Sequence, residues 1–245
     1  MAPAVEIVDI GTADEGRDDA TINADTRQAR EDAKADADAL PARGGGAPAG
    51  TRRQAALTRE RIRWRESEAV GGPAAGQLRD GVRLPKEGGV FFTWDPVRKE
   101  VPNRSWRLWG TDRAVRMVVQ VLREFARENP AAPRVGVGDL SRRGGGDFGA
   151  RFGKLGHASH QNGLDIDVYY SRVDGLERRA KTPARVDRNY AQDLVDRFAA
   201  AGAQKLFVGP SLRLTGPAGV VIPLVNHDDH VHVRLAPSPS APELS

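Results

Sequence analysis

The 245-residue sequence contains no cysteine. Disulfide bonds and thiolate metal sites are therefore excluded, whereas the redox compartment stays undetermined. No apolar run approaches the roughly 18 residues that a membrane-spanning helix needs, so we expect no membrane span. The opening stretch MAPAVEIVDIGTADEG lacks both the positively charged start and the apolar segment of a secretory signal, so the sequence shows no export route.

Aromatic residues are also scarce, at 6% overall, and residues 1–57 contain none. This segment is rich in alanine, aspartate and arginine and includes the flexible stretch GGGAPAG, so we expect it to be disordered. The tail at 237–245, PSPSAPELS, is expected to be disordered as well. Between them, residues 58–236 are predicted to form one folded domain.

The charge is divided unevenly along the chain. Residues 1–40 hold eleven acidic and four basic side chains, a net charge of −7, so the remainder carries 33 basic and 22 acidic residues, a net +11. A basic body suits a polyanionic partner such as nucleic acid or an anionic envelope polymer, but it is equally typical of an ordinary solubilising surface. Since no nucleic-acid recognition motif accompanies the charge, we expect no nucleic-acid partner.

Hydrophobic periodicity predicts both helices and strands in the domain. One helix is expected at 112–128, with Thr111 as its N-cap, and a second at 189–201, terminated by Gly202. Six strands are expected, at 90–94, 134–137, 164–170, 205–208, 220–225 and 229–235. Glycine and proline punctuate 71–85, which is predicted to be loop, and the glycine-rich stretch 144–156 with Arg151 and Lys154 is interpreted as a basic rim beside a site.

All five histidines of the chain fall in two short stretches, GHASHQNGLDIDVYY at 156–170 and NHDDHVHVRL at 226–235. Scattered histidines would need no common explanation. Histidines clustered with aspartates are typical of ligands and bases around one metal ion. Without cysteine, such a metal must be held by imidazole and carboxylate groups.

Strand alternation specifies how these side chains are arranged. His230, His232 and Arg234 share one face of the last strand, because side chains alternate with period two. Two imidazoles on one strand do not complete a site, but Asp167 on the polar face of the earlier strand and His160 in the loop before it can supply the rest. Two histidines and a carboxylate leave an open position, as in catalytic zinc sites, although the same set also suits iron(II) in an oxygenase.

The remaining polar residues are expected to assist this centre. His230 is the predicted general base, next to the activated water. His157 and His227 are predicted to steer ligands or hold the substrate carbonyl. Asp165 shares a face with Asp167 and is expected to be a supporting partner rather than a ligand.

At these residues the sequence resembles a known group of zinc peptidases. SHQNGLDID fits the pattern His-x6-Asp and HVH fits His-x-His, which together mark lysostaphin-type enzymes, D-alanyl-D-alanine carboxypeptidases and the hedgehog signalling domain. Within this group the chain most resembles the penicillin-insensitive murein endopeptidases, whose first motif reads much like GHASHQxGLDxD, and Gly138-Asp139 also fits. The resemblance covers roughly residues 65–236.

The resemblance implies zinc held by His160, Asp167 and His232, with His230 as base, and it adds Asp139 to the groups around the site. It implies an α+β fold in which a small antiparallel sheet carries the metal, flanked by helices and long loops. It also implies hydrolysis of D-alanyl–diaminopimelyl cross-links in the stem peptides of peptidoglycan, and an extracytoplasmic location in the periplasm or cell wall. A zinc-containing but non-catalytic cell-wall or partner-binding module is the alternative, and the sequence leaves the oligomeric state open.

Overall fold

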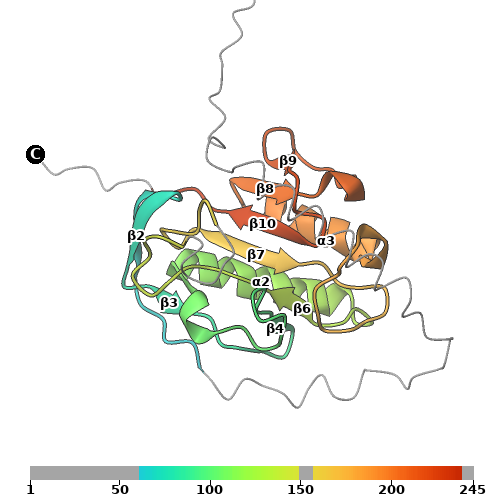
Figure 1. Ribbon diagram of the computed structural model, residues 1–245, viewed down its shortest axis with the longest axis horizontal. Helices are drawn as coiled ribbons and strands as arrows, with labels where there is room; N and C mark the ends of the chain where they lie inside the picture. The colour runs from blue at the N-terminus through green and yellow to red at the C-terminus, as the bar shows by residue number, and fades with distance from the viewer. Residues whose placement is uncertain (1–60, 149–156, 239–245) are drawn as a thin grey trace, which may run out of the picture. The chain divides into compact units, whose positions relative to one another are not determined.

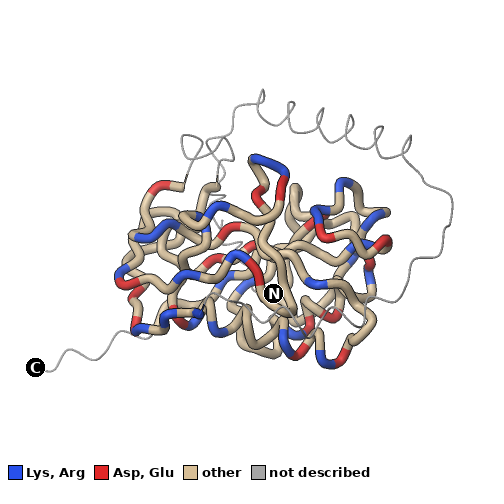
Figure 2. The backbone as a smooth tube through the Cα atoms, turned by 90° about the horizontal axis from the view of Figure 1, so that it is seen from below, with Lys and Arg blue, Asp and Glu red and all other residues tan. Residues whose placement is uncertain are grey.

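A computed structural model describes residues 61–148 and 157–238 of the chain (Figure 1). The predicted disordered segment 1–57, the part of the predicted basic rim that carries Arg151 and Lys154, and residues 239–245 of the tail lie outside the described residues. Within the described residues no helix combines the length and the apolar character that crossing a membrane requires. Lysine and arginine residues are interspersed with aspartate and glutamate along the described backbone (Figure 2).

A six-stranded sheet in the order β4-β6-β7-β10-β8-β9 forms the centre of the fold. Its strands are β4 (Phe91–Thr93), β6 (Val135–Val137), β7 (Asp165–Tyr169), β8 (Lys205–Val208), β9 (Val221–Pro223) and β10 (His230–Arg234). The mixed content of helix and sheet is compatible with the predicted α+β class. All six predicted strands are present, with ends that differ by up to two residues.

The sheet is mixed, so the expectation of an antiparallel sheet is wrong for two pairs of strands. The three central pairings, from β6 to β8, are antiparallel, but β4 pairs with β6 and β8 pairs with β9 in parallel. Parallel neighbours need a long crossover that returns the chain to the same end of the sheet. The segment with helix α2 makes this crossover from β4 to β6, and residues 209–220 make it from β8 to β9.

Two helices cover one face of the sheet. Helix α2 (Asp112–Glu128) has the predicted bounds, and the Thr111 side chain accepts a hydrogen bond from the Ala114 amide. Helix α3 (Arg188–Ala200) begins one residue before the prediction, because the Asp187 side chain accepts from two amides of its first turn. Gly202 follows α3 with φ +86°, as its predicted role as terminator requires.

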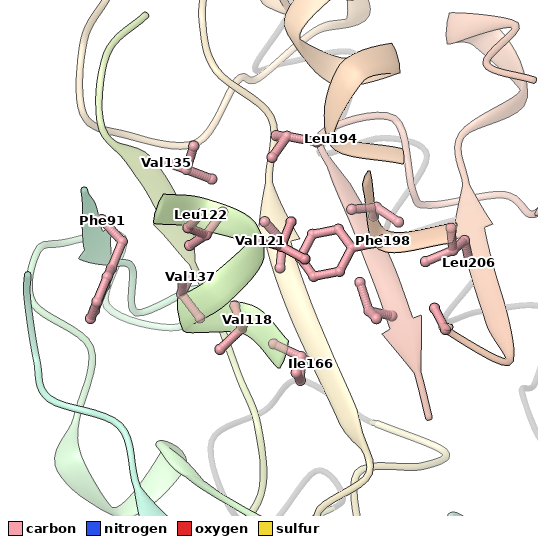
Figure 3. Packing of buried hydrophobic residues seen from close by; sticks show 14 of the residues in the cluster. Phe91, Val118, Val121, Leu122, Val135, Val137, Ile166, Leu194, Phe198 and Leu206 are labelled. Carbon is pink, nitrogen blue, oxygen red and sulfur yellow. The ribbon is translucent and has the colours of Figure 1, made fainter. Parts of the chain in front are cut away.

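The apolar side chains of both helices meet those of the sheet in one core. Ile166, Val168, Val231 and Val233, which alternate along β7 and β10, are completely buried against the helices. Figure 3 shows this packing, with labelled residues that include Val118, Val121, Leu122, Val137, Ile166 and Phe198. Each such side chain contributes about 1.5–3 kcal/mol by leaving water. This burial fixes which face of β7 and β10 is apolar, and leaves the opposite face to their polar residues.

The stretch at 71–85, predicted to be loop, instead contributes to two small sheets. Strand β1 (Glu68–Gly72) pairs with β2 (Ala75–Arg79) as an antiparallel hairpin, and β3 (Val82–Arg83) pairs with β5 (Trp109–Gly110). Gly71 has φ +70°, and a Cβ at Gly76 would lie 2.3 Å from a backbone oxygen. Glycine here permits a tight hairpin and does not end regular structure. Three short 3₁₀ helices, η2 (Ser105–Arg107), η4 (Pro183–Arg185) and η5 (Pro210–Leu212), complete the described elements.

Candidate metal centre

Strands β7 and β10 lie side by side in the middle of the sheet and bring the two histidine-rich stretches together (Figure 1). Their antiparallel register sets His230 opposite Tyr169, His232 opposite Asp167, and Arg234 opposite Asp165. These six residues share the face that does not carry the apolar core, as strand alternation predicts.

His160 reaches this face from the loop that precedes β7. Its ring is completely buried, and its Nδ1–H donates to the Leu140 carbonyl oxygen at 2.6 Å. Because a carbonyl only accepts, this bond leaves Nε2 unprotonated, with its lone pair available. His160 Nε2 lies 3.4 Å from Asp167 Oδ1. The residue has φ +68°, a backbone conformation that costs free energy outside glycine and is often kept at functional sites.

His232 lies between two carboxylates. Its Nδ1 is 3.2 Å from Asp167 Oδ1, and its Nε2 is 3.2 Å from Asp165 Oδ1. Asp165 also accepts from the His160 amide at 2.9 Å and from Arg234 Nε at 2.7 Å. A carboxylate behind an imidazole fixes the ring and its tautomer, which is a usual arrangement behind a metal-binding histidine. Asp165 therefore has the geometry of the supporting partner that the sequence predicts.

Two atoms at this point, His160 Nε2 and Asp167 Oδ1, are buried without a hydrogen-bond partner. Leaving such atoms unpaired costs free energy, and each case calls for an explanation such as a bound ion. Tetrahedral zinc with ligand bonds of about 2.0–2.1 Å puts two ligand atoms about 3.3 Å apart. The separations of 3.4 Å and 3.2 Å around Asp167 Oδ1 fit this value. Two imidazoles and a carboxylate also match the ligand chemistry of zinc.

The electrostatics of the site favour a cation. Burial raises the pKa of Asp167, but His160, His232 and His230 lower it more strongly, so the carboxyl is held well below its usual range. Burial lowers the pKa of His232, whereas Asp165 and Asp167 raise it, to about 9. The pKa of Asp165 is likewise held well below its usual range, so the carboxylates of Asp165 and Asp167 are both ionised at neutral pH. They attract positive charge, which a proton or a metal ion can supply.

His157 is a second candidate for the third metal-binding position. Ligand atoms of His157, His160 and Asp167 all lie within 4.8 Å of one another. The Nε2 of His157 is 2.8 Å from Asp139 Oδ2, so only its Nδ1 faces away from that carboxylate. The described residues therefore offer two candidates for the third ligand beside His160 and Asp167. One is His157, and the other is His232, whose Nδ1 is 3.2 Å from Asp167 Oδ1.

Asp139 lies behind His157 in a buried polar network. Arg107 donates to its carboxylate through Nε at 2.6 Å and through a second guanidinium nitrogen, and Asn103 Nδ2 donates at 3.0 Å. Burial raises the pKa of Asp139, but Arg107 and His157 lower it, to about 2. Asp139 is thus an ionised support for His157, and Arg107, to which the sequence assigned no role, neutralises it.

The last two histidines flank the opposite side of the centre. His230 Nε2 is 3.8 Å from Asp167 Oδ1, and His230 Nδ1 is 2.7 Å from Asp229 Oδ1. The His227 ring centroid lies 4.8 Å from that of His230, and His227 Nδ1 donates to the Val225 carbonyl at 2.8 Å. Burial and the neighbouring His230 lower the pKa of His227 to about 4, so it is neutral at neutral pH. The structure therefore gathers all five histidines and the three predicted aspartates in one region.

Comparison with known proteins shows which family the chain resembles. The model of the family described as "Penicillin-insensitive murein endopeptidase" matches residues 69–212, more than half of the chain. The matched range contains the first histidine-rich stretch and ends before His227. The penicillin-insensitive murein endopeptidase of Haemophilus influenzae is 30% identical over 146 residues, which cover 48% of this chain and 49% of that protein. The protein of the same name from Escherichia coli O157:H7 is 31% identical over 129 residues, covering 40% of this chain and 44% of that protein. The chain thus spans about half the length of the curated relatives that it matches.

Proposed function

The chain belongs to the penicillin-insensitive murein endopeptidase family, and we propose that it is a zinc-dependent peptidase that hydrolyses peptide cross-links of peptidoglycan. The observation that carries the proposal is the convergence of His160 Nε2 and His232 Nδ1 on Asp167 Oδ1, at 3.4 Å and 3.2 Å. Spacing of this kind, around two buried atoms that have no hydrogen-bond partner, His160 Nε2 and Asp167 Oδ1, supports a tetrahedral zinc site with one open position.

In this proposal His160, Asp167 and His232 hold the zinc ion. When bound, zinc polarises the scissile carbonyl and makes water a nucleophile at neutral pH. Leu140 and Asp165 orient the two imidazoles through the nitrogens that do not face the metal. These contacts keep the ligand atoms in place before the metal arrives.

His230 is the proposed general base. Its Nε2 faces the same Asp167 oxygen from 3.8 Å, beyond the separation expected for two zinc ligands but within reach of a water between them. His230 Nε2 would accept the proton of the attacking water and then deliver it to the nitrogen of the leaving amine, so that no net proton is consumed. His227, neutral and close to His230, and His157, held by Asp139, are the groups proposed to orient the substrate carbonyl.

The proposed substrate is the D-alanyl–diaminopimelyl cross-link between stem peptides, which agrees with the name of the relatives as murein endopeptidases. Such a substrate requires action outside the cytoplasm, in the periplasm or cell wall. Because attack by water requires no serine nucleophile, β-lactams, which acylate serine, are expected not to inhibit the reaction.

Mass spectrometry of a defined cross-linked muropeptide dimer tests the proposal. The zinc-loaded full chain should release the two monomers, and a chelator should abolish this release until zinc is added back. A His230→Ala control should hold zinc and release the monomers at least about 10²-fold more slowly than wild type. If the wild-type chain holds zinc and binds peptidoglycan but releases no fragment from any cross-linked dimer, the protein is a zinc-containing binding module and the proposed hydrolysis is wrong.

A further inference from the structure

Asp229, the residue immediately before β10, bridges two positively polarised groups. Its Oδ1 lies 2.7 Å from His230 Nδ1, and its Oδ2 lies 3.2 Å from Arg179 Nε. Its backbone carbonyl accepts from the Tyr170 amide at 3.0 Å, which fixes the residue at the end of β7. The carboxylate is 19% exposed, so these contacts are largely protected from water.

The chemistry of this contact selects one tautomer of His230. An ionised carboxylate only accepts hydrogen bonds, so the proton of neutral His230 must be on Nδ1, which faces Asp229. The lone pair is then on Nε2, the nitrogen that faces Asp167 Oδ1 from 3.8 Å. In the opposite tautomer Nε2 would carry a hydrogen and could not accept a proton from water.

We propose that Asp229 is a positioning residue for His230: it places the proton of the neutral ring on Nδ1 and aims Nε2 at the reaction site, and Arg179 holds Asp229 in the orientation that does so. The inference rests on the proposed function, in which His230 is the base. Asp229 itself does not contact the substrate in this scheme. It acts by fixing the His230 ring and by stabilising the positive charge that His230 gains during the reaction.

The two contacts of Asp229 make Asp229→Asn an informative variant. Arg179 offers only donors, so it pairs with the amide oxygen of the new side chain. The NH₂ group is then directed at His230 Nδ1, which must accept, and the His230 proton moves to Nε2. Replacing the aspartate of a serine-protease triad by asparagine selects the wrong tautomer in this way and lowers kcat about 10⁴-fold. In the double variant with Arg179→Met, the new amide side chain at position 229 no longer pairs with a guanidinium. Its oxygen can then turn toward His230 Nδ1 and accept the proton there.

The experiment compares wild type, Asp229→Asn, Arg179→Met and the double variant as zinc-loaded full chains acting on the cross-linked muropeptide dimer. Asp229→Asn should lower kcat about 10²–10⁴-fold, with KM and zinc content close to those of wild type. The double variant should recover at least about tenfold of that loss, an outcome that a merely structural role of Asp229 would not give. An Asp229→Asn protein with wild-type kcat, or a double variant no more active than Asp229→Asn, would overturn the proposal.

A second measurement separates this inference from the proposed function. In the ¹⁵N spectrum of histidine-labelled protein, with the His230 signals assigned by loss in His230→Gln, neutral His230 should carry its proton on Nδ1 in wild type and on Nε2 in Asp229→Asn. If the wild type cleaves no muropeptide, the proposed function fails, but the tautomer still tests Asp229. If the tautomer is the same in both proteins, the role of Asp229 is wrong even when cleavage is observed.

Discussion

His232 lies directly opposite Asp167 in the antiparallel pairing of β10 with β7, and its Nδ1 is 3.2 Å from Asp167 Oδ1. A shift of the register by one residue would turn every side chain of β10 to the other face, exchanging the histidines with the buried valines. The apolar core therefore specifies the geometry of the candidate metal site, because the burial of Val231 and Val233 fixes the direction of His232.

The third zinc ligand is predicted to be His232 and not His157. His232→Ala should hold less than one-tenth of the zinc of wild type after dialysis, since one of three ligands is lost. His157→Ala should keep close to one equivalent, because Asp139 engages the Nε2 of His157. Elemental analysis of the dialysed proteins measures both values. Loss of zinc in His157→Ala with retention in His232→Ala would reverse the assignment.

His230 is predicted to affect chemistry and not metal binding. His230→Gln should lower kcat on the muropeptide dimer about 10²–10⁴-fold, the usual contribution of a general base. The zinc content of His230→Gln should equal that of wild type. His230 Nε2 lies 3.8 Å from Asp167 Oδ1, farther than two ligand atoms of one tetrahedral zinc ion are expected to lie from each other. Steady-state kinetics combined with elemental analysis checks both. A His230→Gln protein without zinc would show that His230 is a ligand.

Asp165 is predicted to tune zinc affinity from behind His232. Asp165→Asn should weaken zinc binding about 10–100-fold, since the amide supports the His232 ring less well than the carboxylate does. Competition with a chelator of known affinity measures the change. Asp196→Asn, an exposed position on α3, is the matched control and should leave the affinity unchanged. Equal affinities in the two variants would contradict the role given to Asp165.

The buried pair of Arg107 with Asp139 is predicted to be essential for stability. Arg107→Met leaves an ionised carboxylate without its main partner, which should lower the free energy of unfolding by about 3–5 kcal/mol. Arg79→Met breaks the exposed pair with Glu68, whose side chains are each 61% exposed, and should cost less than about 1 kcal/mol. Urea denaturation of both variants measures the difference. Similar small losses would show that Asp139 does not depend on Arg107.

The pair of Arg107 with Asp139 should also make the free energy of unfolding depend on pH, with a defined sign. The pKa of Asp139 is lowered to about 2 in the folded protein, below an unfolded value of about 3.9. Its contribution to stability is therefore present above about pH 4 and lost as the pH falls toward 2. In Arg107→Met, protonation of the unpaired carboxyl relieves the penalty, so the difference in unfolding free energy between the proteins should shrink on acidification. A difference that stays constant down to about pH 2 would contradict this account.

The parts of the fold that depend on local pattern were predictable from the sequence. Helix α2 has the predicted bounds because its apolar period and the cap at Thr111 are both local signals. The polar and apolar faces of β7 and β10 follow from strict alternation. The parallel pairing of β4 with β6 depends on a crossover through the whole of α2, and no short-range signal encodes it.

In the candidate site, too, the residues in local motifs were predictable from the sequence, whereas contacts from distant segments were not. The motifs identified the histidines and the aspartates at 165 and 167, because their spacing is local. Arg107, Arg179 and the Leu140 carbonyl reach the site from distant segments, and arginines or carbonyls carry no signal for such contacts. Asp229 could have been found, since a carboxylate next to a proposed histidine base is a natural partner. The glycine and proline pattern at 71–85 predicts loop and carries no local signal for the hairpin of β1 and β2.

Anomalous diffraction at the zinc edge from crystals of the zinc-loaded chain tests the central claim most directly. The claim predicts one strong peak within about 2.0–2.2 Å of His160 Nε2, Asp167 Oδ1 and His232 Nδ1. A peak bound by His157 in place of His232, or no peak among these residues, would contradict it.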